Sequence, residues 1–264
     1  RHTRLQGDWS SDVCSSDLEP LMARHPARVA FEAAGGDGEA WFASNLPSGR
    51  GLGFSGASIV AGTTLALAQR DGIDADDLDR FIATSRDEIL HRATEIEGHP
   101  DNVAASLFGG VVAVANDRVV RLPIGFDARL VAWIPRDTTS TSKSRSVLPA
   151  SYERDAVVFN LGRIALLIEG LRTGDLESLS MGVEDRLHQD RRLAAAPMSR
   201  RALETLRELG ARAVWLSGSG PTVIALCDAA DADSLCDRAT ASLDELEGRV
   251  TTMSIDERGA RQAT

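Results

Sequence analysis

Four glycines at positions 49, 51, 53 and 56 lie in one short stretch that runs into a segment of helical character at residues 55–69. Glycine reaches positive φ without strain and leaves its backbone N–H uncovered. The first turn of the following helix adds unpaired N–H groups and the positive end of the helix dipole. Together these groups suit an anion, most often a phosphate. On the glycines alone, a plain turn that caps a helix remains an alternative.

Two common phosphate-binding loops do not fit this stretch. The pattern G-x-x-x-x-G-K-[ST] fails, because no lysine follows any of the glycines. Residues 51–56 match G-x-G-x-x-G, but a dinucleotide site needs a strand that runs straight into the first glycine. Residues 47–50 intervene here, and no acidic residue closes a second strand about twenty residues on. We therefore reject the dinucleotide interpretation.

Carboxylates are the second requirement, since phosphoryl transfer relies on charge neutralisation, usually through Mg²⁺. Magnesium takes one or two carboxylates and keeps several waters and phosphate oxygens. Glu95 and Glu97 are rival candidates here, and on the residues alone either would more often be a solvated surface charge. His99, Asp101 and Asn102 follow within a few residues, where Asp and Asn would also serve as helix N-caps.

The loop from Pro47 to Ala57 resembles the ATP-binding motif P-x-x-x-G-L-G-S-S-[AG]-[AS] of the GHMP kinase superfamily. One residue departs from it: Phe54 stands where the first serine is usual, while the second is Ser55. Further blocks narrow the resemblance to the homoserine kinase family and fall in that family's order. They are residues 97–104 with 107–110, 140–149, 184–192 and 217–222.

The resemblance implies a set of site residues. The ATP loop would comprise Pro47, Gly49, Arg50, Gly51, Leu52, Gly53, Ser55, Gly56 and Ala57, and the Mg²⁺ ligands would be Ser55 and Glu97. Substrate-binding residues would be His99, Asp101, Thr141, Arg145 and Arg192. The expected catalytic residues are Asp101, Asn102 and Arg145.

Particular roles follow for some of these residues. Arginine holds a carboxylate in a two-pronged geometry, which suits Arg145 and Arg192 facing an amino-acid substrate. Either Arg192 or the adjoining Arg191 could occupy the arginine position of this motif. Asp101 could assist deprotonation of the acceptor hydroxyl, whereas His188 is expected to be a hydrogen-bonded structural residue. The turn at 217–222 would pack near the phosphate loop.

The resemblance implies a magnesium- and ATP-dependent kinase that phosphorylates L-homoserine to O-phospho-L-homoserine in threonine biosynthesis. The same-superfamily alternative is a kinase for mevalonate or shikimate. A third possibility is a catalytically silent nucleotide-binding fragment. The partner would be a small molecule rather than nucleic acid or membrane, and a homodimer is possible.

Residues 1–18 have a different character. The run from Asp8 to Leu18 resembles the conceptual translation of a sequencing-library adapter, so we exclude it from fold reasoning. The family's N-[LM]-G-x-G-[FY]-D motif is not found. If the adapter interpretation holds, we expect the first strands of the N-terminal domain to be missing.

Composition agrees with a cytoplasmic enzyme. The 264 residues are 43% hydrophobic, and the formal net charge of −10 argues against nonspecific nucleic-acid binding. No apolar run is long enough to cross a membrane. The three cysteines lack metal-site spacing and suggest no disulfide scaffold.

Hydrophobic patterns predict helices at 55–69, 77–96, 154–171, 175–186, 199–209 and 232–245, with strands at 41–44, 111–122, 130–134, 213–216, 223–227 and 249–256. Helices layered on an antiparallel or mixed sheet indicate an α+β fold. The resemblance implies the GHMP kinase fold, with an incomplete S5-like N-terminal domain at 19–136, a ferredoxin-like C-terminal domain at 137–264, and the active site between them.

Overall fold

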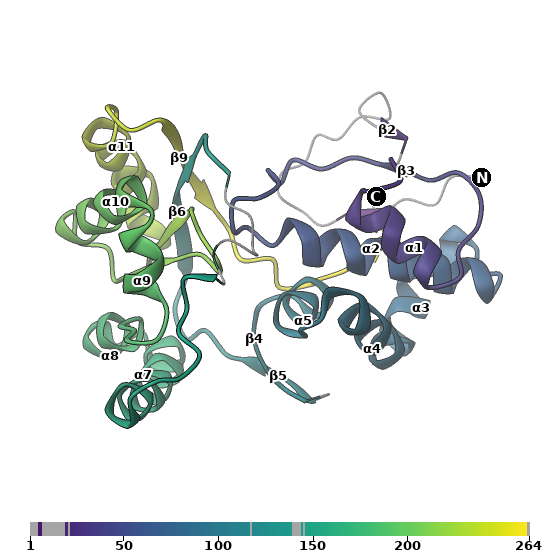
Figure 1. Cartoon of the computed structure of the whole chain (residues 1–264), viewed down its shortest axis with the longest axis horizontal. Helices are drawn as coiled ribbons and strands as arrows, with labels where there is room; N and C mark the ends of the chain where they lie inside the picture. The colour runs from purple at the N-terminus through teal and green to yellow at the C-terminus, as the bar shows by residue number, and fades with distance from the viewer. Residues whose placement is uncertain are drawn as a thin grey trace. The chain divides into compact units, whose positions relative to one another are not determined.

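The computed structural model describes residues 5–6, 19–20, 22–116, 118–138, 144 and 146–262. They form two compact units, which we treat separately (Figure 1). The first unit draws on residues 1–47, 53–121 and 256–264, and the second on 48–52 and 122–255. The glycine-rich loop therefore contributes residues to each unit. The adapter-like segment, apart from Leu5 and Gln6, lies outside the described residues, as do the predicted site residues Thr141 and Arg145.

Helices dominate the first unit. They are α1 (Pro26–Ala33), α2 (Phe54–Arg70), α3 (Leu78–Thr84), α4 (Arg86–Glu97) and α5 (Asp101–Phe108), with a 3₁₀ turn at Ala75–Asp77. Helix α2 packs against α1, α4 and α5. Its buried side chains Ile59 and Leu67 share one apolar core with Ile89 of α4 and with Val103 and Leu107 of α5. Because α2 is surrounded in this way, its N-terminal turn is held firmly at one end of the core.

One expected helix of this unit is in fact two. The pattern at 77–96 predicts a continuous helix, but Ser85 adopts φ −108° and ψ 13° between α3 and α4. Both helices keep their apolar faces on the core, with Ile82 before the break and Ile89 after it. Each helix has its own buried apolar residues, so the apolar pattern continues across Ser85. The pattern alone therefore gives no sign that the helix ends there.

Short antiparallel strands complete the first unit. They are β1 (Leu5–Gln6) with β10 (Arg261–Gln262), β2 (Glu19–Pro20) with β3 (Trp41–Phe42), and β4 (Val111–Ala115) with β5 (Arg118–Leu122). The strand predicted over 111–122 is therefore a hairpin, which turns where Asn116 takes a φ of 52°. Val112, Val114 and Val119 of the hairpin pack on the unit's core.

The second unit is built on a four-stranded antiparallel sheet. Its strands β6 (Ala128–Pro135), β7 (Ala213–Leu216), β8 (Val223–Asp228) and β9 (Gly248–Met253) lie in the order β7-β8-β6-β9. Its helices are α7 (Arg154–Thr173), α8 (Leu176–Gly182), α9 (Gln189–Ala194), α10 (Pro197–Glu208) and α11 (Ala232–Ser242), with a 3₁₀ turn at Ala229–Asp231. This strand order is that of a β-α-β-β-α-β ferredoxin-like unit. The predicted α+β class and C-terminal architecture are confirmed.

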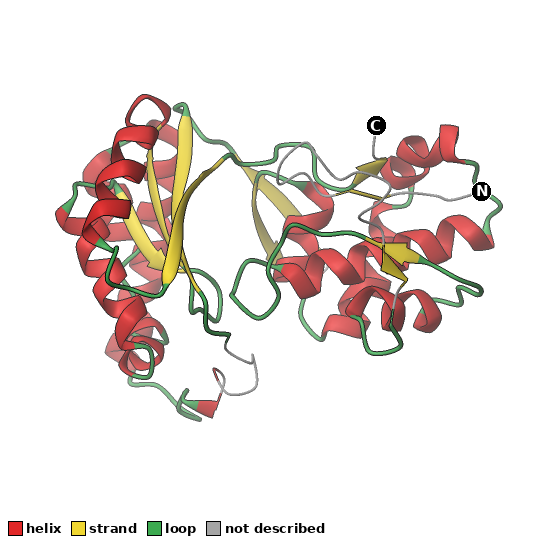
Figure 2. Ribbon diagram, turned by 90° about the horizontal axis from the view of Figure 1, so that it is seen from above, coloured by secondary structure: helices red, strands yellow, loops and turns green. Residues whose placement is uncertain are grey.

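Alternating side chains give this sheet two apolar faces. Val131 and Trp133 of β6 point into a core shared with Leu206 of α10 and Leu235 of α11. Figure 2 shows helices gathered along one face of the sheet. On the other face, Ala132 and Ile134 pack with Leu52 of the glycine-rich loop. The loop is thus seated on the sheet by an apolar side chain.

Within the described part of the chain, every helix is too short or too polar to span a bilayer.

Candidate active site

The N-terminus of α2 presents backbone N–H groups that no side chain caps. Gly53 occupies the N-cap position with φ 78° and ψ 12°, and the first turn of the helix contains no acidic residue. Glycines 49 and 51 also have positive φ, at 68° and 76°. A 17-residue helix that begins in this way offers its positive end and its first amides to an anion. This geometry is the one that a phosphate-binding loop requires.

Ser55, in the first turn of α2, contacts a carboxylate from another helix. Its hydroxyl donates a 2.9 Å hydrogen bond to Oε2 of Glu97. Glu97 ends α4, and its side chain is only 12% exposed. Gly98 follows with φ 85° and turns the chain toward α5. A hydroxyl and a largely buried carboxylate beside an anion-binding helix end form an oxygen donor set that suits Mg²⁺.

The donor set also limits which metals fit. Among the described residues, no group of three or more His, Cys, Asp or Glu side chains is placed to hold a metal ion. Magnesium requires fewer protein ligands, since it keeps waters and phosphate oxygens in its shell. The rival carboxylate Glu95 is 55% exposed and lies within ion-pair distance of His91 and Arg92. The structure therefore brings Glu97 to Ser55 and leaves Glu95 on the surface.

His99 and Asp101 adjoin this pair. His99 Nδ1 lies 2.6 Å from Asp101 Oδ1, and His99 Nε2 lies 3.9 Å from Glu97 Oε1. Asp101 is the first residue of α5, where its carboxylate accepts the Asn102 N–H at 2.8 Å while remaining 70% exposed. The N-cap residue of α5 is Pro100, which makes no side-chain cap hydrogen bond, so the N-cap role expected of a bare Asp-Asn pair is not met. The exposed carboxylate is also accessible to a substrate hydroxyl.

Asn102 is held at this place by a close helix crossing. A Cβ added to Gly56 would lie 2.8 Å from the Cβ of Asn102, closer than real side chains approach. The first turns of α2 and α5 can meet only because residue 56 is glycine. The crossing brings Ser55, Glu97, His99, Asp101 and Asn102 together in the first unit.

The second unit holds the other end of the loop. Ser217 Oγ donates to Gly51 O at 2.7 Å, and the Thr222 N–H donates to Arg50 O at 3.3 Å. A Cβ at Gly51, which has positive φ, would overlap the carbonyl oxygen of Ser217. The turn at 217–222 therefore packs against the phosphate loop, as the resemblance implied.

Arg50 anchors the same segment through its side chain. Its guanidinium donates to Pro135 O at 2.9 Å, to Arg136 O at 2.6 Å and to Ser48 O at 3.1 Å. These are main-chain carbonyls at the end of β6 and in the loop itself. The side chain predicted to contact the nucleotide therefore also fixes the position of the loop on the sheet.

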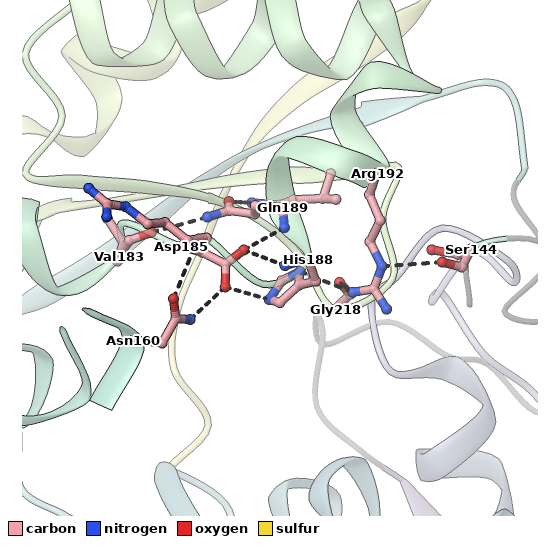
Figure 3. A network of polar contacts seen from close by, with 10 residues as sticks. Ser144, Asn160, Val183, Asp185, His188, Gln189, Arg192 and Gly218 are labelled. Atoms are coloured by element: carbon pink, nitrogen blue, oxygen red, sulfur yellow. Dashed lines mark hydrogen bonds and ion pairs between the residues drawn. The ribbon is translucent and has the colours of Figure 1, made fainter. Parts of the chain in front are cut away.

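Arg192 of α9 reaches the same turn. Its Nη1 donates to Gly218 O at 3.0 Å and lies 3.2 Å from His188 Nδ1, and its Nε lies 3.5 Å from Ser144 O (Figure 3). Ser144 in turn donates through Oγ to Ser219 O at 2.7 Å. These contacts favour Arg192 over Arg191 as the residue directed into the region of the turn.

Both halves of the chain match family models. Residues 23–110 match the GHMP kinases N terminal domain, and residues 167–245 match the GHMP kinases C terminal model. Homoserine kinase from Streptomyces avermitilis is 39% identical over 269 residues, covering 98% of this chain and 82% of the relative. Homoserine kinase from Desulfitobacterium hafniense is 37% identical over 223 residues, covering 82% of this chain and 72% of the relative. The chain belongs to the homoserine kinase family.

A solved structure supports the fold of this family member. The crystal structure of homoserine kinase from Cytophaga hutchinsonii superposes with a TM-score of 0.74 at 24% identity, covering 91% of this chain and 79% of that one. At that identity the likeness concerns the fold alone. It confirms the GHMP kinase fold predicted from the motifs.

Phe54, the departure from the ATP-binding motif of the GHMP kinases, is accounted for by packing within the first unit. Its ring lies edge-on to Phe42 and to His25, with centroids 6.1 Å and 5.5 Å apart. His25 stacks on Phe42 at 4.4 Å, and burial lowers the pKa of its imidazole. The aromatic ring therefore joins the start of α2 to α1 and β3, a role that a serine would not fill.

Asp185 is the residue of the homoserine kinase block 184–192 whose role sequence reasoning missed. Its side chain, 8% exposed, accepts from the His188 and Gln189 N–H groups at 2.7 Å and 2.6 Å and from Asn160 Nδ2 at 2.7 Å (Figure 3). Burial tends to raise its pKa, but the hydrogen bonds from Gln189, Asn160 and His188 outweigh that effect and lower it. The N-cap residue of α9 is His188, three residues further on, so no local capping pattern marked Asp185.

The contacts of Asp185 bear on Arg192 through α9. Gln189 Oε1 accepts the Leu216 N–H at 2.7 Å, which joins α9 to β7. Burial lowers the pKa of His188, with the nearby Asp185 raising it and Arg192 lowering it further. A neutral His188 can accept from Arg192 Nη1. The block therefore forms one polar network that orients the arginine, and His188 takes part in it as a hydrogen-bonded residue.

Proposed function

We propose that this chain transfers the γ-phosphoryl group of ATP to the side-chain hydroxyl of L-homoserine, giving O-phospho-L-homoserine and ADP. The carrying observation is the contact between Ser55 and the largely buried Glu97 at an uncapped helix end, in a chain of the homoserine kinase family. The reaction needs charge neutralisation at phosphates more than covalent chemistry. This site supplies amides, a hydroxyl and a carboxylate for that purpose.

The loop residues divide the nucleotide-binding work. Backbone N–H groups of Gly49, Gly51, Gly53, Ser55, Gly56 and Ala57 would bind the phosphates, with Pro47, Arg50 and Leu52 shaping the loop. Ser55 Oγ and the Glu97 carboxylate would hold Mg²⁺, which neutralises phosphate charge when bound. The hydrogen bond between these two groups keeps both oxygens at one place in its absence.

We assign the amino-acid substrate to the remaining predicted residues. Asp101, whose carboxylate is exposed, would accept the hydroxyl proton, with His99 Nδ1 at 2.6 Å to share the charge. Asn102 would lie beside the transferring phosphoryl group. Arg192, together with Thr141 and Arg145, would bind the substrate carboxylate, because a guanidinium matches that group in two-pronged geometry.

The proposal extends to the organisation of the chain. The proposed domains are residues 19–136 for ATP binding and 137–264 for the C-terminal domain, with the adapter-like residues 1–18 excluded. The compact units differ from these bounds, because β6 (Ala128–Pro135) lies in the sheet of the second unit and β1 pairs with β10 in the first. Removal of residues 1–18 is then expected to leave ATP binding unchanged. A small-molecule kinase of threonine biosynthesis would act in the cytoplasm.

The test measures binding and turnover on the same purified sample. ATP binding is followed by calorimetry, and ADP release is followed with L-homoserine, mevalonate or shikimate as acceptor in the presence of Mg²⁺. Homoserine-dependent ADP release supports the proposal. Turnover with one of the other acceptors alone would reassign the chain to a sibling kinase. ATP binding without any turnover would favour the silent nucleotide-binding alternative.

A further inference from the structure

Helix α5 carries Asp101 and Asn102 in its first turn and is only eight residues long. Isolated helices of this length are marginal in water, so tertiary contacts must hold this one. Val103, Ala104 and Leu107 are fully buried in the core of the first unit, which holds one face of the helix. The last carbonyl groups of a helix have no partner within it and need donors from elsewhere.

One such donor comes from the end of the chain. After β9, the chain joins the first unit again, and we call its residues 256–262 the C-terminal strap. The Ala260 N–H donates to Leu107 O at 3.2 Å, and Asp256 O accepts the Gly110 N–H at 2.7 Å. The strap therefore lies directly against the C-terminal end of α5.

Two glycines meet where the strap crosses the end of the helix. Gly109, the C-cap residue of α5, has a φ of 68°, and Gly259 of the strap has a φ of 72°. A Cβ added to Gly259 would lie 2.5 Å from Leu107 O and 2.6 Å from the nitrogen of Gly109, closer than real side chains approach. A Cβ added to Gly109 would overlap the nitrogen of Gly259. Main chain therefore touches main chain here, and no flexible side chain absorbs a displacement.

The strap is also held in place by its own side chains. Arg261 Nη1 donates to Asp256 Oδ2 at 2.8 Å and to Gly259 O at 2.9 Å, and the Arg261 side chain is only 16% exposed. Beyond it, the Gln262 N–H donates to Asp79 Oδ1 of α3 at 2.6 Å. Gly259 thus lies in a closed turn that is anchored on a second helix of the same unit.

We propose that the C-terminal strap, through Gly259, sets the position of α5 along its axis and thereby places Asp101 and Asn102 for phosphoryl transfer. This inference rests on the proposed function, in which Asp101 accepts the hydroxyl proton. Gly56 limits the approach at the first turn of α5 and Gly259 at its last, so the helix is fixed at both ends. Eight residues span about 12 Å, and a rigid helix of that length passes a shift at one end to the other. A misplacement of about 1 Å at a reacting group can cost about 100-fold in rate.

The test compares Gly259→Ala with Gly72→Ala in the full chain. Gly72 has a φ of 66° and nothing within 4 Å of an added Cβ, so this control brings the backbone strain without the overlap. We expect kcat with homoserine to fall by about 10–100-fold in Gly259→Ala. The KM for ATP should change much less, because Arg50 and Leu52 anchor the ATP loop elsewhere. Gly72→Ala should keep both wild-type values.

A second readout does not depend on turnover. His99 Nδ1 lies 2.6 Å from Asp101 Oδ1, so the NMR signals of the His99 ring report the position of the Asp101 carboxylate. These signals should shift in Gly259→Ala and stay unchanged in Gly72→Ala. A wild-type chain without homoserine kinase activity would contradict the proposed function, whereas the His99 signals would still test the strap.

Asp256→Asn serves if Gly259→Ala folds poorly. It keeps an acceptor oxygen but removes the charge that holds Arg261, so we expect a several-fold fall in kcat and a smaller shift of the His99 signals. Glu257→Gln is the control on the same strap. The Glu257 side chain is 60% exposed and pairs with Arg121 on the surface, where an ion pair contributes little.

Two outcomes would overturn the proposal. In the first, kcat and the His99 signals of the strap variants match those of their controls, whatever happens to the melting temperature, and the strap then only stabilises the fold. In the second, the KM for ATP changes as much as kcat does, and the strap then acts on the whole site rather than on the position of α5.

Discussion

Ser55 Oγ donates a 2.9 Å hydrogen bond to Oε2 of Glu97, across 42 residues of sequence. The contact joins the first turn of α2 to the last residue of α4. It requires both helix ends to be placed by the core they share, where Ile59 of α2 packs with Ile89 of α4. In the sequence, Glu97 is one glutamate among many and is only weakly indicated as a metal ligand. Its contact with Ser55 distinguishes it from the others.

The first prediction concerns the charge of Glu97. Glu97→Gln keeps an oxygen that accepts from Ser55 but removes the negative charge that would attract Mg²⁺. We expect the Mg²⁺ concentration for half-maximal activity to rise by about 10–100-fold, the effect typical of altering a metal's supporting groups. The measurement is a titration of homoserine-dependent ADP release with Mg²⁺.

The rival carboxylate gives the matched control. Glu95→Gln removes the same charge two residues earlier, from a side chain that is 55% exposed and close to Arg92. Its Mg²⁺ titration should follow the wild type. If Glu95→Gln shifted the titration more than Glu97→Gln did, the assignment of the metal ligand would be wrong.

The second prediction concerns the crossing of α2 and α5. Gly56→Ala places a Cβ 2.8 Å from that of Asn102, so one helix must move. Overpacking of this kind costs about 1–3 kcal/mol in the free energy of unfolding. We expect a lower melting temperature together with weaker ATP binding, measured by differential scanning fluorimetry and calorimetry.

A double variant tests the cause of that loss. In Gly56→Ala with Asn102→Gly the second Cβ is gone, and the melting temperature should recover in part while turnover stays low. Equal melting temperatures for Gly56→Ala and the wild type would show that the crossing tolerates a side chain.

The third prediction concerns Asp185 as a positioning residue. Asp185→Ala leaves two N–H groups of α9 and the amide of Asn160 without their acceptor, at a cost of about 1–3 kcal/mol. Because α9 carries Arg192, we expect a several-fold rise in KM for homoserine with little change in KM for ATP. Steady-state kinetics with each substrate varied in turn provide the measurement.

Two control variants test whether Asp185 acts by positioning Arg192 or only by stabilising the fold. Asp190→Ala removes a carboxylate of the same helix that is 78% exposed, and should leave both KM values unchanged. Asp185→Asn keeps one acceptor oxygen and should lie between Asp185→Ala and the wild type. A parallel rise in both KM values would contradict a role specific to the substrate end.

The fourth prediction concerns pH. Burial lowers the pKa of His188 below the ordinary value of about 6.5. Between the lowered pKa and the ordinary one, the unfolded chain therefore binds more protons than the folded chain. By linkage, stability rises with pH across that window and falls as the pH drops through it. NMR titration of the histidine side chains should show a His188 midpoint under 6.5.

Two neighbours of His188 predict how control variants should change its pKa. Asp185 raises this pKa and Arg192 lowers it. Asp185→Asn should therefore move the midpoint further down, and Arg192→Gln should move it up. A His188 that titrates above 6.5 in the wild-type chain would contradict the network shown in Figure 3.

Local sequence patterns predicted many of the helices and strands. The helix expected at 55–69 is α2 at Phe54–Arg70, and the strands expected at 213–216 and 223–227 are β7 and β8. The two strands are short apolar runs on either side of a turn that contains Gly218 and Gly220, and α2 follows a glycine-rich loop, so local patterns are enough to predict these segments. The motifs also placed Ser55 and Glu97 together before the structure did.

What was missed depends on contacts distant in sequence. Helix α9 has six residues, too few for a period to show, and Asp185, which accepts the N–H of its first residue, is bound by Asn160, which lies 25 residues earlier. The packing of Phe54 depends on Phe42 and His25, which no local pattern links to the loop. Such residues acquire their roles only when the tertiary structure brings their partners near.

Arg50 directs its guanidinium to three carbonyls, and Ser55 donates its hydroxyl to Glu97, so the other donors of residues 49–57 are main-chain amides. Main-chain amides are identical whichever purine a nucleotide carries. A loop of this kind therefore senses the charge and spacing of a polyphosphate chain but cannot discriminate adenine from guanine. A preference for one purine is therefore expected from groups other than the amides of the glycines, and a comparison of ATP, GTP and ITP binding would report on those groups.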